Sequence, residues 1–187
     1  MKNKISRFLF NLKRKKLKRQ QKKFLNYADI QTVLVLFESN LNEKNPYVNQ
    51  ILKQLEADGK KVTLCGYVDK KMSEQPALPD FYMLDRSQIG FFGEPKTAFV
   101  APLLKKQFDV VLDLTLSDIL PLHYIIMYAN APLKVGRKIE NCDILDFMID
   151  LKDGEKPMTV GNEDYIAQRV YLLEQIIFYL KSIKSHK

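Results

Sequence analysis

The stretch FDVVLDLTLSDILPLHYIIMYANAPLKVGRK, residues 108–138, decides the fold of this 187-residue chain. It opens with Phe108-Asp109-Val110-Val111-Leu112-Asp113-Leu114, whose apolar, β-favouring residues predict a strand buried on both faces. Ser117 or Asp118 then offers a cap for a helix, and a short strand follows at Leu133 to Gly136. A strand, a helix and another strand at this spacing predict a βαβ unit and therefore a parallel sheet.

The flanking sequence continues the same alternation. Asn45 and Pro46 are a suitable cap and first-turn pair for a helix that Gly59 would end. The other expected strands are Val33 to Phe37, Lys61 to Val68, Phe81 to Asp85 and Phe147 to Leu151. The other expected helices are Pro102 to Gln107 and Asn162 to Lys184.

These elements predict the fold class and the domain organisation. We expect one α/β domain over residues 29–187, a three-layer, Rossmann-like, mostly parallel sheet of order 3-2-1-4-5 with Phe147 to Leu151 as the candidate sixth strand. Cys65 and Cys142 stand at no metal-type or redox-type spacing, so a reducing, cytoplasmic compartment is expected. No apolar run approaches the roughly 20 residues of a membrane-spanning helix.

Residues 1–28 differ from the rest of the chain in charge. They hold eleven basic residues and no acidic one. The remaining 159 residues therefore contain 19 basic and all 22 acidic residues and are slightly acidic. The segment lacks Gly and Pro and predicts a protruding basic helix, with Ile5, Phe8, Leu9 and Leu12 sharing one face. The residues expected to bind an anionic surface are Lys13, Arg14, Lys15, Lys16, Lys18, Arg19, Lys22 and Lys23.

The partner of this helix is open between an anionic bilayer, a nucleic acid and an acidic protein, and a plain solvated arm is a further alternative. The apolar stripe slightly favours a membrane surface or a protein, because phosphate binding alone has no use for it. We therefore expect a non-enzymatic binding or adaptor protein in the cytoplasm, or peripheral at the inner face of the membrane.

A small ligand would sit where parallel strands end, beside the switch in strand order. The polar residues expected at that edge are Glu38, Ser39, Asn40, Asp113, Thr115, Ser117 and Arg137. Such residues also cap helices and close turns, which is the more frequent role. The alternative function is a small enzyme that uses Asp113 or Glu38 as a base.

Several kinds of chemistry lack their sequence signals. Neither a dinucleotide fingerprint, a P-loop, a nucleophile elbow nor a zinc-type spacing is present, so no cofactor and no metal is predicted. His123, inside a helix, is expected to be a surface or packed imidazole rather than a base. Phe91 and Phe92, in the loop of residues 89–95, are expected to pack into the core, with an exposed anchor for a partner as the alternative.

Two resemblances rest on quoted residues. The loop FFGEP (residues 91–95), the strand ending in Asp113, and the Leu-Pro-Leu helix followed by Lys134-Val135-Gly136 resemble a short uncharacterised bacterial family. Residues 108–138 are also similar to the N-terminal half of heptosyltransferase-like, two-Rossmann glycosyltransferases. That resemblance implies a degenerate acceptor-binding domain, although Asn40 and Leu41 stand where those enzymes carry a Gly-Asp pair.

Overall fold

A six-stranded, all-parallel sheet forms the centre of the molecule. The computed structural model describes residues 2–17, 23–39, 46–72, 81–139, 143–151 and 163–183. The strand order is β3-β2-β1-β4-β5-β6, which confirms the predicted order and adds the sixth strand at its end. The strands are β1 (Thr32–Glu38), β2 (Lys61–Tyr67), β3 (Phe81–Leu84), β4 (Val110–Asp113), β5 (Leu133–Arg137) and β6 (Phe147–Ile149).

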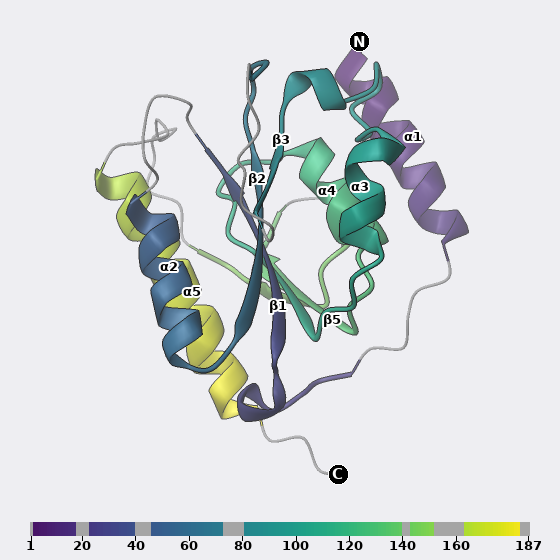
Figure 1. The fold of residues 1–187 in the computed structure, drawn as a ribbon. Helices are drawn as coiled ribbons and strands as arrows, with labels where there is room; N and C mark the ends of the chain where they lie inside the picture. The colour runs from purple at the N-terminus through teal and green to yellow at the C-terminus, as the bar shows by residue number, and fades with distance from the viewer. Residues whose placement is uncertain are drawn as a thin grey trace.

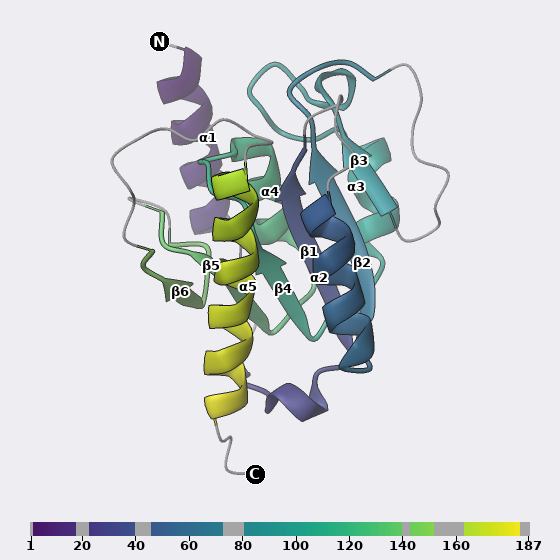
Figure 2. The same ribbon diagram turned by 90° about the vertical axis from the view of Figure 1, so that its left-hand side faces the viewer.

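Helices cover both faces of this sheet and make the three predicted layers. On one face α2 (Pro46–Ala57) and α5 (Glu163–Ser182) lie side by side (Figure 1). On the other lie α3 (Thr97–Leu104), α4 (Leu120–Tyr128) and the N-terminal helix α1 (Lys2–Lys16). Figure 2 looks onto the α2 and α5 face, with β6 at one edge of the sheet.

The core consists of two apolar clusters, one on each face of the sheet. Successive residues of a strand point to opposite faces, so β1 contributes Val33 and Val35 to one cluster and Leu34 and Leu36 to the other. All of these side chains are at most 1% exposed, as expected for the central strand of a parallel sheet. The predicted α2 boundary at Gly59 is confirmed, since Gly59 has a positive φ of 75° just beyond the helix.

Two helix starts differ from their predictions. Helix α3 begins at Thr97 and contains Pro102 within it, whereas we predicted a helix that begins at Pro102. The burial of Val100 and Leu103 on one face determines where this helix lies, and Pro102 on its exposed face is tolerated. Helix α4 begins at Leu120, so its N-cap position is Ile119, whose side chain has no hydrogen-bond acceptor, rather than Ser117 or Asp118. The carboxylate of Asp118 pairs with Arg7.

The N-terminal helix is shorter than predicted and does not protrude. It ends at Lys16, and residues 23–26 are not helical, so a helix spanning residues 1–28 is wrong. In the next described segment, the N–H of Lys23 donates to the carbonyl of Pro132 over 3.3 Å. Helix α1 packs against α4 and places Phe10, fully buried, in the same apolar cluster as Tyr124.

Candidate functional site

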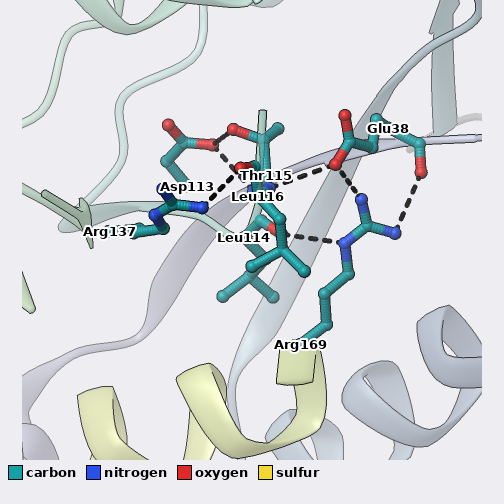
Figure 3. Close-up of polar contacts among 7 residues, drawn as sticks. All are labelled: Glu38, Asp113, Leu114, Thr115, Leu116, Arg137 and Arg169. Carbon is teal, nitrogen blue, oxygen red and sulfur yellow. Dashed lines mark hydrogen bonds and ion pairs between the residues drawn. The ribbon is translucent and has the colours of Figure 1, made fainter. Parts of the chain in front are cut away.

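A buried ion pair joins α5 to the carboxyl end of β1. The guanidinium of Arg169 is fully buried and pairs with the carboxylate of Glu38, whose side chain is 7% exposed. Arg169 also donates through Nε to the carbonyl of Leu114 over 3.1 Å, just beyond β4 (Figure 3). The same Glu38 carboxylate accepts the N–H of Leu116 over 3.1 Å. One side chain of α5 therefore holds together the ends of two neighbouring strands.

A second polar group lies at the end of β4. Asp113 accepts the hydroxyl of Thr115 over 2.8 Å and its N–H over 3.1 Å, so its carboxylate closes the turn after the strand. Arg137 reaches from β5 and donates to the carbonyl of Leu116 over 2.6 Å (Figure 3). At Gly136 a Cβ would stand 2.8 Å from both the Cβ and the carbonyl oxygen of Asp113, so β5 leaves no room there for a side chain.

The environment of Asp113 disfavours its charge. Burial raises the pKa of this carboxyl from the ordinary 3.8 to about 6, and the nearby Glu38 adds to the effect. The hydrogen bonds from Thr115 and the charge of Arg169 act in the opposite direction. Because the carboxyl is 1% exposed and committed to a turn, these contacts favour a structural role over the role of a base.

This shift predicts a pH dependence of stability. The unfolded chain releases the Asp113 proton near pH 3.8, whereas the folded protein holds it to about pH 6, so the stabilisation is complete below pH 3.8 and is lost as pH rises through 6. In urea titrations we expect the free energy of unfolding of the wild type, relative to Asp113→Asn, to fall by about 2–3 kcal/mol between pH 4 and pH 7.

Asp109→Asn is the matched control. Burial opposes the ionisation of Asp109, but N–H donors of Thr32 and Gln31 lower its pKa overall. The stabilisation that ionised Asp109 contributes is therefore present above its unfolded pKa and is lost as pH falls through its folded pKa. Its dependence on pH is opposite in sign to that of Asp113. A difference between wild type and Asp113→Asn that stays constant from pH 4 to pH 7 would contradict the prediction.

A large open groove lies above the carboxyl ends of β1 and β2. Its volume is about 1070 Å³, and its walls come from the N-terminal half of α1, the strand ends, residues 86–93 and the start of α4. The charged lining residues are Lys4, Arg7, Glu38, Asp69, Arg86 and Asp118. This is the place where parallel α/β sheets bind ligands, beside the switch in strand order between β1 and β4.

The predicted site residues divide between this groove and the turns behind it. Glu38 and Ser39 line the groove. Asp113, Thr115 and Arg137 are held in the contacts described above and are not among its lining residues, and neither is the exposed Ser117. Asn40 lies outside the described residues.

Sequence reasoning missed Arg169 and the part that α1 plays. Arg169 stands at i, with Leu172, Leu173 and Ile176 at i+3, i+4 and i+7, and all four side chains are fully buried. A charged residue in register with the apolar face of a helix was the signal for a buried partner. No comparable signal in the sequence placed Arg7 beside Asp118, because these residues are 111 positions apart.

Ion pairs tie α1 to the domain. Arg7 pairs with Asp118 and lies 3.0 Å from Nδ1 of His123, Lys13 pairs with Glu94, and Arg14 pairs with Asp143. Two of the predicted anion-binding residues, Lys13 and Arg14, thus make contacts within the protein. Lys15, Lys16 and Lys23 are exposed, and Lys18, Arg19 and Lys22 lie outside the described residues.

The outward face of α1 is apolar as well as basic. Ile5 is 45% exposed, Phe8 61% and Leu12 41%, although Phe10 of the same helix is fully buried. The prediction that Phe91 and Phe92 pack into the core is wrong. Phe91 is 72% exposed at the groove, and residues 89–95 form a closed loop in which Gly90 and Glu94 are joined by a backbone hydrogen bond.

His123 is the packed imidazole that we predicted, because its ring is fully buried beside Phe10 and burial lowers its pKa to about 4. Within the described ranges, His, Cys, Asp and Glu side chains form no group of three that could hold a metal ion. Over the same part of the chain, every helix is too short or too polar to span a membrane.

Comparison with known proteins bears on the two resemblances. No curated protein and no solved structure matches the chain significantly, so the similarity to heptosyltransferase-like enzymes stays a prediction. A family match over residues 2–163 spans α1, the groove and all six strands, and it confirms the resemblance to an uncharacterised family. The chain belongs to the family described as "Family of unknown function (DUF6913)".

Proposed function

We propose that this protein is a non-enzymatic binding protein that docks on an anionic bilayer through the outward face of α1. The observation that carries the proposal is the contrast within one helix. Phe10 is fully buried against α4, whereas Ile5, Phe8 and Leu12 are 41–61% exposed. A helix that is already held by one apolar side chain has no structural need for a second apolar face.

The arrangement of charge around these residues supports a membrane as the partner. At about 100° per residue, Ile5, Phe8 and Leu12 span an arc of about 60°. Lys4 and Lys15 lie on one side of that arc and Lys16 on the other, and all three are exposed. In such helices the apolar side chains enter the headgroup boundary while each nearby Lys adds about 1 kcal/mol with anionic lipid.

A bilayer fits this face better than a nucleic acid does. Neutralising phosphates requires only cations, so RNA binding would leave three exposed apolar side chains without a role. The predicted location, peripheral at the inner face of the membrane, follows from the same chemistry because anionic lipids enrich that leaflet. The rival reading of an enzyme has weaker support, since Glu38 is paired with Arg169 and Asp113 closes a turn.

Co-sedimentation of the full chain with vesicles tests the proposal. We expect binding to vesicles with 30% phosphatidylserine, weak binding to pure phosphatidylcholine, and weakening of about tenfold or more in Phe8→Ser, because a buried Phe contributes about 1.5–3 kcal/mol. Phe178→Ser is the matched control, since Phe178 is 62% exposed on α5, on the other face of the sheet. It should bind like the wild type.

The charge contribution has its own pair of variants. Lys15→Gln with Lys16→Gln should weaken binding and flatten its dependence on salt, whereas Lys53→Gln with Lys61→Gln, elsewhere on the surface, should do neither. Equal sedimentation of Phe8→Ser and Phe178→Ser would count against membrane docking. Binding of the wild type to RNA but not to anionic vesicles would reassign the helix to nucleic acid.

A further inference from the structure

The groove over the strand ends has features of a ligand site, and of its described lining residues Lys4 alone also flanks the outward apolar face of α1. Its volume of about 1070 Å³ is at the upper end of small-molecule sites. Positively charged side chains line the groove from two separate elements: Lys4 and Arg7 belong to α1, and Arg86 belongs to the 3-10 turn after β3. Residues so distant in sequence meet only because α1 packs beside α4 at this edge of the sheet.

The two arginines are held in position by carboxylates that are easily released. Asp118, paired with Arg7, has a side chain that is 50% exposed, and Asp69, paired with Arg86, is 65% exposed. The Arg86–Asp69 pair, exposed on both sides, contributes at most about 1 kcal/mol, whereas Arg7 is 28% exposed and its pair with Asp118 is only partly open to solvent. A dianionic phosphate can therefore take the place of a carboxylate at either guanidinium, where it forms charge-assisted, bidentate hydrogen bonds.

The rest of the lining suits hydroxyl groups and a ring. Carboxylates accept hydrogen bonds from hydroxyls, and a released Asp69 or Asp118 would face the groove as an acceptor. The 72% exposed ring of Phe91 offers an apolar surface beside them. In contrast, the carboxylate of Glu38 is neutralised by Arg169, so it adds little repulsion toward a phosphate.

We propose that this groove binds a small phosphate ester that carries hydroxyl groups, with Arg7, Lys4 and Arg86 on the phosphate and the carboxylates on the hydroxyls. The assignment concerns binding alone, and it stands whether or not the outward face of α1 docks on a bilayer.

Calorimetric titration of the full chain, without vesicles, tests this assignment. The probes are glucose 6-phosphate, ribose 5-phosphate and glycerol 3-phosphate, with inorganic phosphate and glucose as the two partial ligands. We expect saturable binding of at least one ester, at least about tenfold tighter than inorganic phosphate, and no binding of glucose. Arg86→Gln and Lys4→Gln should each weaken that ester by about tenfold, whereas Lys53→Gln on α2 should not.

Arg7→Gln is a stronger perturbation because Arg7 also ties α1 to Asp118. Binding by Arg7→Gln is therefore interpreted together with a circular dichroism spectrum and a melting curve, which show whether the variant is folded. Arg86→Gln does not have this difficulty, because Arg86 pairs with Asp69, which lies outside α1. Failure of all three esters to bind would overturn the assignment. So would inorganic phosphate binding as tightly as the esters, or binding that survives Arg86→Gln and Lys4→Gln together.

Discussion

Arg169→Met is expected to lower the free energy of unfolding by about 3–5 kcal/mol, because it leaves the carboxylate of Glu38 buried without its cation. The same substitution removes the donor to the carbonyl of Leu114. Methionine keeps most of the apolar volume of the side chain, so the loss reports on charge rather than on a cavity. Urea denaturation at pH 7 measures it.

Two companion variants separate the charge from the packing. Arg86→Met breaks an ion pair whose side chains are 60% and 65% exposed, and it should cost at most about 1 kcal/mol. Glu38→Gln in the Arg169→Met background removes the stranded charge but keeps an acceptor for the N–H of Leu116, so it should recover much of the loss. An Arg169→Met protein as stable as Arg86→Met would show that the buried pair is unimportant.

Phe10→Ala is expected to release α1 from the domain. The ring of Phe10 is fully buried and stacks edge-on against Tyr124, with ring centroids 4.9 Å apart. Removing a buried Phe costs about 3–5 kcal/mol, whereas each partly exposed ion pair of α1 contributes about 1 kcal/mol, so the remaining contacts hold the helix weakly. We expect the amides of α1 to lose their protection in hydrogen exchange while those of β1 and β4 keep theirs.

Phe8→Ala is the matched control for this experiment. It makes the same substitution on the same helix at a side chain that is 61% exposed, so helix propensity changes equally and packing does not. Hydrogen exchange of α1 in Phe8→Ala should stay close to that of the wild type. Similar exchange in the two variants would mean that α1 is not held by Phe10.

The strands were the most predictable part of the molecule. The apolar runs at Val33 to Phe37 and Val110 to Leu112 need no knowledge of their neighbours, because the centre of a strand buried on both faces is apolar at successive positions. The crossover rules for parallel strands then limited the order of the sheet to few choices. The boundary of α3 was less predictable, because the burial of Val100 and Leu103 outweighed the usual place of proline at a helix start.

The candidate site could be predicted only in outline. The rule that ligands bind at the carboxyl ends of parallel strands pointed to Glu38 and Ser39, and both line the groove. It could not distinguish an accessible side chain from one that closes a turn, as Asp113 does. The rule could not predict Arg7 and Arg86 at the groove, because the positions of their elements depend on contacts with residues distant in the sequence.

The sequence by itself determined that this chain is a parallel α/β domain with a basic N-terminal helix, because hydrophobic periodicity and turn residues act over short range. Tertiary structure alone decided which face of that helix is buried and which faces solvent. Both sides of α1 carry apolar residues, and only the fit of Phe10 beside Tyr124 selects the face that is buried. The choice turns Ile5 and Phe8 toward solvent and Arg7 toward the groove, since one helix cannot bury opposite faces against a single neighbour.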